Sequence, residues 1–263
     1  GVVLRRTAFS PNIKDRLDYS CALFDQKGEL CAQAAHIPVH LGSMAYAMAD
    51  IVGQFEWAER DVLVLNDPYL GGTHLPDVTI VAPVMLEGKL QGFAVNRAHH
   101  ANIGSESPGS MPITHLLEEE GIIISPQFLL HKGELNQTLW RSLTPIHGQK
   151  DNFHLNGDMA AQVSSVNAGV LRLQELIRKF GLDAFHQGLI ELNDYGERVA
   201  LACLGTIPSG LYAFEDVMDD DGLGNQDIAI RVSLHVQNQG IEVDFSGTAD
   251  QVSGNINCPL PVV

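Results

Sequence analysis

The run DVTIVAPVMLEGKLQGFAVNRAHH, residues 77–100, is the stretch that most directly determines the fold. Two apolar, β-branched segments of about eight residues flank the Glu-Gly pair at 87–88, and this pattern predicts two antiparallel strands joined by a tight turn. A two-residue turn would place Asp77 opposite Ala98, whereas a three-residue turn would place it opposite His99. Directly opposed residues in such a ladder have Cβ atoms roughly 5 Å apart. The hairpin therefore brings an acid at its start close to a histidine pair at its end.

The segment before the hairpin, NDPYLGGTHLPD at 66–77, adds a second histidine to this end. Because His74 lies just beyond the strand on the same side, we expect His74, Asp77 and His99 to converge. Two imidazoles and a carboxylate are a common ligand set for Zn²⁺, Mn²⁺ or Fe²⁺. The sequence therefore predicts a divalent metal site.

The register of the hairpin is uncertain by one residue because Pro83 interrupts the first strand. A slip of one residue would exchange His99 for His100 as the residue facing the acid. Without the slip, His100 points to the opposite face of the sheet.

Each of these residues also has an ordinary structural interpretation. Asp67 precedes a proline, which is typical of a residue that forms a turn. His74 is typical of a histidine in a turn, and Asp77 of an acidic residue at the start of a strand. His36 and His40 are four residues apart but flank a proline, so they cannot share one face of a helix. We expect these two histidines to pack or to support ligands rather than to bind a metal.

The rest of the chain predicts an α+β fold with antiparallel β-hairpins, a mixed sheet and a central helical pair. A second hairpin is expected around the DQKG turn at 25–28, and a long Gly/Ser/Pro loop at 101–117. Helices are expected from about Ser43 to Ala58, with Ser43 as N-cap, and as a pair between 157 and 205, beginning at Asp158 as N-cap. Strands return from Gly210, and the acidic run DDDGLGNQD at 219–227 is expected to form a hairpin turn rather than a calcium loop.

These elements divide the chain into three expected segments: a β-rich lobe with the metal site at 1–156, the helical pair at 157–205 and a C-terminal β segment at 206–263. We expect them to belong to one continuous domain. The chain opens on glycine and ends on NINCPLPVV, so we expect it to be a fragment of a larger fold.

Composition excludes several classes of function. The 263 residues carry a net charge of −16, which argues against nucleic-acid binding because no basic surface is available to neutralise phosphates. No apolar run is long enough to span a membrane. The four cysteines lack CxxC spacing, which favours free thiols and a cytoplasmic location. Since no nucleotide-binding motif is present, any ATP would have to be used by another chain or domain.

Six motifs occur in an order that resembles the hydantoinase B family: RRTAFSPNIKDRLDYSCALFD, HIPVHLGSM, GGTHLPD, RAHHANIG, PGSMP and EEEGI. The resemblance covers essentially the whole chain. The family includes the B-type component of ATP-dependent N-methylhydantoinase, the C-terminal half of 5-oxoprolinase and the α-type subunits of acetone and acetophenone carboxylases.

The resemblance implies a two-component enzyme in which an A-type partner uses ATP to activate a carbonyl or amide by phosphorylation. The B-type component carries a divalent metal in the carboxylases, on ligands that correspond to His74, Asp77 and His99. Family members commonly read HHADIG where this chain has Asn102, which can still form hydrogen bonds but cannot take a proton. The role of base would then move to Asp67, Glu118 or Glu119. The residues expected to take part in catalysis are Asp67, His100, Asn102 and Glu119.

Three functions agree with this resemblance. The first is the B-type component of an ATP-dependent amidohydrolase that opens a cyclic amide such as N-methylhydantoin or 5-oxoproline. The second is a subunit of an ATP-dependent ketone carboxylase. The third is a non-catalytic scaffold that the A-type partner needs for assembly.

Overall fold

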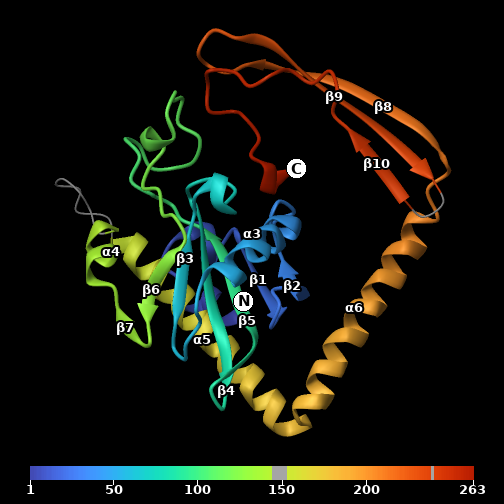
Figure 1. Ribbon diagram of the computed structural model, residues 1–263. Helices are drawn as coiled ribbons and strands as arrows, with labels where there is room; N and C mark the ends of the chain where they lie inside the picture. The colour runs from blue at the N-terminus through green and yellow to red at the C-terminus, as the bar shows by residue number, and fades with distance from the viewer. Residues whose placement is uncertain (144–152, 238–239) are drawn as a thin grey trace. The chain divides into compact units, whose positions relative to one another are not determined.

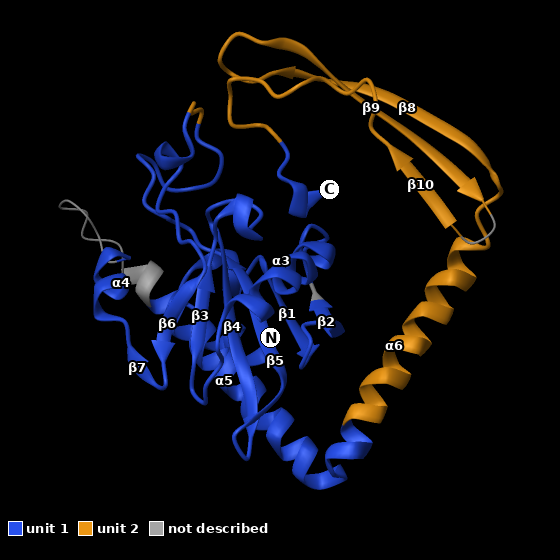
Figure 2. Cartoon of the chain, in the orientation of Figure 1, with its two compact units in different colours: residues 1–112, 116–185, 258–263 blue, residues 113–115, 186–257 orange. Residues whose placement is uncertain are grey.

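The computed structural model describes residues 1–143, 153–237 and 240–263, and the chain divides into two compact units (Figure 2). Unit 1 comprises residues 1–112, 116–185 and 258–263, and unit 2 comprises residues 113–115 and 186–257. The boundary falls inside helix α6 (Leu182–Leu204). The long helix of the expected helical pair, α5 (Phe153–Phe180), therefore belongs with the β-rich part of the chain, because it packs on the sheet there.

A seven-stranded sheet forms the centre of unit 1, in the order β2-β1-β5-β4-β3-β6-β7. The strands are β1 (Tyr19–Asp25), β2 (Leu30–Ala35), β3 (Val62–Leu65), β4 (Asp77–Leu86), β5 (Lys89–His99), β6 (Gln127–His131) and β7 (Glu134–Leu135). The α+β class is confirmed, and both short hairpins form where the sequence predicts them. We expected a mixed sheet, but every pair among the described strands is antiparallel. A parallel pair needs a long crossover connection between neighbouring strands. The two long connections of this sheet, β2 to β3 through α3 and β5 to β6 through residues 100–126, join strands that are not neighbours.

The register of the β4–β5 hairpin combines both alternatives considered from the sequence. The turn at 87–88 has two residues, since Leu86 pairs with Lys89. A β-bulge opposite Val84 and Met85 then shifts the pairing by one residue, so that Asp77 faces His99. The bulge thus decides which residue faces the acid.

The sheet is covered by α3 (His40–Gln54) on one face and by α5 on the other (Figure 1). Alternation along β4 sends Val78 and Ile80 into the core beneath α5 and Val81 into the core beneath α3. Along α3, a stripe recurring every three or four residues is fully buried: Met44, Ala47, Met48 and Ile51. Burial of a side chain the size of methionine or isoleucine stabilises the fold by about 1.5–3 kcal/mol.

Both predicted N-caps are wrong. Helix α3 begins at His40 rather than near Ser43, and the Ser43 hydroxyl instead donates to the Val39 carbonyl at 2.7 Å. Asp158 lies inside α5, where its carboxylate accepts hydrogen bonds from the backbone amides of Phe9 (2.6 Å) and Ser10 (3.2 Å). Ser43 also accepts a hydrogen bond from Arg97, so both polar side chains take part in long-range contacts that the local sequence does not reveal.

The remaining elements of unit 1 are short: α1 (Val2–Thr7), α2 (Pro11–Lys14), the 3₁₀ turns η1 (Pro68–Leu70), η2 (Leu117–Glu119) and η3 (Leu260–Val262), and α4 (Gln137–Ser142). Apart from η2, the predicted loop at 101–117 is irregular throughout, as expected. No helix in the described part of the chain has the length and apolar character required to cross a bilayer.

Unit 2 consists of most of α6 and a three-stranded antiparallel sheet in the order β10-β9-β8. The strands are β8 (Gly210–Asp220), β9 (Gln226–Gln237) and β10 (Gly240–Asp244). The acidic run forms the β8–β9 turn, as predicted. The sequence NQG at 238–240 also predicts a hairpin turn after β9, and residues 238–239 lie outside the described residues.

Candidate metal centre

Four side chains converge on the carboxylate of Asp77 at the start of β4. Oδ1 lies 3.2 Å from Nε2 of His74 and 3.2 Å from Nδ1 of His99. Oδ2 lies 3.2 Å from Nε2 of His40 and accepts a hydrogen bond from the Thr73 hydroxyl at 2.6 Å. The side chain of Asp77 is only 3% exposed, so a buried carboxylate is surrounded by three imidazoles.

Two different features of the backbone bring the predicted ligands together. The bulged register of the hairpin places His99 directly across from Asp77. The loop before β4 then turns back, so that the rings of His74 and His99 have centroids 4.9 Å apart. The structure therefore brings together His74, Asp77 and His99, the three residues that the sequence predicts as metal ligands.

Glycines allow the loop to take this path. Gly71 has a left-handed φ of 101°, and a Cβ there would lie 2.7 Å from the Cβ of Ala47 on α3. A Cβ on Gly72 would lie 2.2 Å from the carbonyl oxygen of Asn66. The Asn66 side chain closes the base of the loop by donating to the Leu75 carbonyl at 2.7 Å.

Sequence reasoning missed the direct contacts of two residues in the cluster. His40 is fully buried at the start of α3, and its second ring nitrogen, Nδ1, lies 2.9 Å from the Ser20 hydroxyl. Asp18 immediately precedes β1, and its Oδ2 lies 4.0 Å from Nδ1 of His99. Asp18 reaches the cluster through the pairing of β1 with β5, and His40 through the packing of α3 on the sheet, and no local spacing predicts either. The prediction that His40 supports the ligands agrees with its position behind Asp77.

The described residues form two groups whose possible ligand atoms all lie within 4.8 Å of one another, and Asp77 belongs to both. One is His74, Asp77 and His99, and the other is Asp18, His40 and Asp77. The side chain of His74 is 31% exposed and that of His40 only 1%. The cluster is therefore accessible from the His74 side.

The electrostatics of the cluster favour a charged carboxylate. Burial alone would raise the pKa of Asp77, but hydrogen bonds from His40, His74 and His99 hold that pKa well below its usual value. Burial tends to lower the pKa of His74, yet its hydrogen bond with Asp77 and the nearby negative charges raise that pKa overall. Glu120 is one of these charges, and the sequence did not single it out.

The position of His100 does not support the expected catalytic role. Strand alternation turns it to the α5 face, where its Nε2 lies 2.8 Å from Oε1 of Gln162. The side chain is 1% exposed, and burial lowers its pKa. His100 is therefore a buried neutral histidine that joins the sheet to α5.

Three further predicted catalytic residues are used in local turns. Asp67 caps η1 by accepting from the amide of Tyr69 at 2.9 Å. Asn102 accepts from the amide of Gly104 at 2.8 Å, and Glu119 accepts from the amide of Leu116 at 3.2 Å. These bonds stabilise the backbone, because each follows a short-range side chain-to-main chain pattern. The turn interpretation considered for Asp67 is thus the one that the structure displays.

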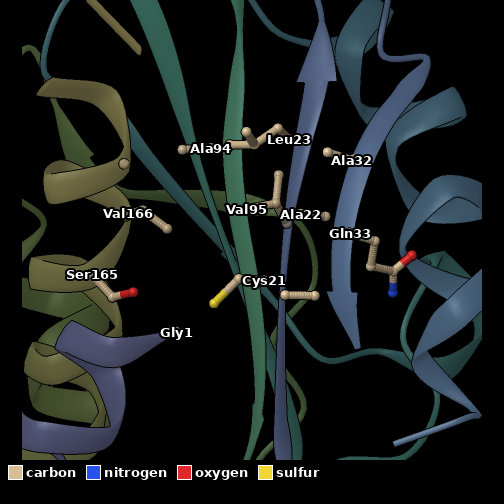
Figure 3. A pocket seen from close by; sticks show the side chains of 12 residues that line it. Gly1, Cys21, Ala22, Leu23, Ala32, Gln33, Ala94, Val95, Ser165 and Val166 are labelled. Carbon is tan, nitrogen blue, oxygen red and sulfur yellow. The ribbon is translucent and has the colours of Figure 1, made fainter. Parts of the chain in front are cut away.

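A cavity of about 350 Å³ lies between α5 and the β1, β2 and β5 strands (Figure 3). Cys21 and Ser165 are among its few polar lining residues, and most of the others are alanine, glycine, leucine or valine. Its lining contains no histidine and no carboxylate. This cavity is therefore separate from the chemistry around Asp77.

A model of the hydantoinase B/oxoprolinase family matches residues 1–263. The chain belongs to this family. The 5-oxoprolinase of Dictyostelium discoideum is 33% identical over 100% of this chain and 21% of its own length. The putative B-type subunit of a D-/L-hydantoinase from Pseudomonas sp. (strain NS671) is 32% identical over 99% of this chain and 46% of its own length.

The crystal structure of the ATP-dependent caprolactamase from Pseudomonas jessenii has the same fold as this family member. It superposes with a TM-score of 0.90 at 30% identity, covering 99% of this chain and 45% of the other. The chain thus spans less than half the length of these relatives.

Proposed function

We propose that this chain is the metal-bearing, B-type part of an ATP-dependent enzyme that hydrolyses a cyclic amide. The observation that carries the proposal is the convergence of two imidazoles on the buried carboxylate of Asp77, with His74 partly open to solvent. The relatives named above act on ring amides according to their names, and all three are at least 30% identical to this chain. These relatives favour hydrolysis over ketone carboxylation.

The donor set fits a divalent cation such as Zn²⁺, Mn²⁺ or Fe²⁺. His74, Asp77 and His99 would hold the ion, and Asp18 is placed beside His99 to supply a further oxygen. His40 and Thr73 both contact Oδ2 of Asp77, which leaves Oδ1 for the ion. A bound cation would polarise a carbonyl or phosphoryl oxygen and lower the pKa of a bound water.

The residues around the ligands hold them in position. The Ser20 hydroxyl contacts His40, which contacts Asp77, and such hydrogen bonds behind a ligand fix its orientation. The buried Thr73 hydroxyl restrains the same carboxylate oxygen from the loop. A ligand carboxylate fixed from two sides needs little reorganisation when the ion binds.

ATP would be used by an A-type subunit or domain, since no phosphate-binding motif occurs in this sequence. We therefore propose that the chain works in a complex or fusion with such a component. That component would activate the amide of a small-molecule substrate, and the metal site of this chain would act on the activated species.

The test is metal analysis combined with turnover of the full-length protein and its ATP-using partner. Metal content and ATP-coupled hydrolysis of 5-oxoproline, hydantoin and caprolactam are measured for the wild type, His74→Ala and Asp77→Ala. The control is His235→Ala, which changes an exposed histidine of β9 in unit 2. We expect the two site variants to lose metal and turnover together and the control to keep both. Loss of metal with unchanged turnover would exclude a catalytic role and leave the scaffold function.

A further inference from the structure

Arg97 is the largest of the fully buried side chains in the described part of the chain. It lies on β5, two residues before His99, and therefore points to the same face of the sheet. Its side chain is 0% exposed, although an arginine is almost never fully buried without a paired carboxylate.

Each nitrogen of the Arg97 guanidinium binds a different element. Nε donates to the Thr79 hydroxyl on β4 at 2.8 Å, Nη1 donates to the Ser43 hydroxyl on α3 at 2.7 Å, and Nη2 donates to the Gly71 carbonyl at 2.9 Å. All three acceptors are neutral. The negative charge of Asp77 also acts on Arg97. Burial lowers the pKa of Arg97 to about 10, so the guanidinium stays charged at neutral pH.

Each contact reaches a segment that carries a residue of the cluster. Gly71 belongs to the loop that delivers Thr73 and His74 to Asp77. Ser43 lies one turn after His40 on α3, on the same side of the helix. Thr79, the third acceptor, lies on β4 two residues after Asp77. One side chain thus links the segments that bring Asp77 its partners.

We propose that Arg97 is a positioning residue. Its three hydrogen bonds hold the loop of Gly71 and the first turn of α3 in place. In this arrangement, Thr73, His74 and His40 contact Asp77. Its effect on activity rests on the function proposed above. Its effect on the loop does not, because the contacts exist without a metal.

Lysine cannot replace arginine in this role. An ammonium group is a single point of donation on a flexible stem, whereas the planar guanidinium directs its donors in fixed directions. Arg97→Lys keeps the positive charge near Asp77 but cannot form all three hydrogen bonds of the guanidinium at once. It therefore separates positioning from electrostatics.

The first experiment measures hydrogen–deuterium exchange of peptides covering residues 66–76 in the full-length protein, with metal removed by chelator. In the wild type, the amides of Leu70 and Gly72 donate to the Asp67 carbonyl at 3.1 and 2.8 Å. We expect Arg97→Lys to speed exchange of this loop by about tenfold or more, because a link to a charged donor has been lost. Arg231→Lys is the control, since that exposed arginine contacts Glu215 and Gly247 in unit 2.

The second experiment titrates the same variants with Co²⁺ and follows its visible absorption. We expect the dissociation constant of Arg97→Lys to rise by about 10–100-fold, as is usual when a group supporting the ligands is lost. Addition of millimolar guanidinium to Arg97→Ala should restore slow loop exchange and part of the affinity, whereas ethylammonium should not. A side chain that only fills space would show no such selective rescue.

The outcomes are distinct. The proposal is overturned if the exchange rate of the loop and the Co²⁺ dissociation constant of Arg97→Lys both stay within twofold of the wild-type values. Should the Arg97 variants fail to fold, Ser43→Ala and Thr79→Val remove two acceptors separately while keeping the arginine. We expect both to speed loop exchange, because a guanidinium with fewer fixed contacts holds the Gly71 carbonyl less firmly. Unchanged loop exchange in both variants would overturn the proposal. If the wild type binds no Co²⁺, the proposed function fails, and loop exchange alone decides the role of Arg97.

Discussion

Replacement of Asp77 by asparagine tests how strongly the carboxylate holds the cluster together. Asparagine has nearly the same shape, and its one oxygen can keep two of the four hydrogen bonds described above. The NH₂ group then faces the two partners of the other carboxylate oxygen, and their hydrogen bonds to a charged acceptor are lost. Two lost hydrogen bonds to a charged group, at about 1.5–3 kcal/mol each, give about 3–6 kcal/mol. Because removing a buried charge regains part of its hydration energy, we expect a net loss of about 3 kcal/mol in the free energy of unfolding.

The assay is urea unfolding of the metal-free protein, followed by the fluorescence of Trp57 and Trp140, both in unit 1. The depressed pKa of Asp77 means that its stabilisation is present above the unfolded-state pKa and is lost as pH falls through the lower folded-state value. The stability of the wild type should therefore fall more steeply in acid than that of Asp77→Asn. Asp50→Asn, on the exposed side of α3, should change stability by less than about 0.5 kcal/mol. A loss below about 1 kcal/mol for Asp77→Asn at pH 7 would refute the reasoning.

Three other predictions concern the same end of the sheet. Metal affinity, measured by Co²⁺ titration, should increase as pH rises through the raised pKa of His74, because the imidazole must lose its proton to bind the ion. A metal affinity that does not change between pH 6 and pH 8 would exclude His74 as a ligand. Gly72→Ala should destabilise the protein by about 1–3 kcal/mol and weaken metal binding, since its Cβ would meet a carbonyl oxygen at 2.2 Å. Gly53→Ala is the matched control in α3, where nothing lies within 4 Å, and thermal unfolding should show no loss of stability. Asn66→Ala removes three hydrogen bonds from the base of the loop and should lower the free energy of unfolding, measured in urea, by about 2–4 kcal/mol. A loss below about 1 kcal/mol would show that the loop closes without the Asn66 side chain.

The sequence by itself determined the elements whose signals are local. Alternating apolar residues around a Glu-Gly turn predicted the β4–β5 hairpin, and the DQKG turn predicted the β1–β2 hairpin. The proximity of His74, Asp77 and His99 followed from the same hairpin, because opposed strand positions are neighbours wherever a tight turn joins them. Their role as metal ligands stays a prediction.

Tertiary structure decided what local patterns leave open. The bulge in β5, and not the turn, selects His99 as the partner of Asp77 and sends His100 to the opposite face. Ser43 and Asp158 look like helix caps in the sequence, yet each satisfies a group brought from a distant part of the chain.

The same reason explains why Asp18, His40 and Arg97 could not be assigned from their sequence neighbours. Asp18 and His40 reach the cluster only because β1 pairs with β5 and α3 packs across that sheet. Arg97 acquires its three partners from segments far apart in the chain. A buried polar group must be satisfied by whatever the fold places beside it, and those neighbours exist only once the sheet and both helical layers have assembled.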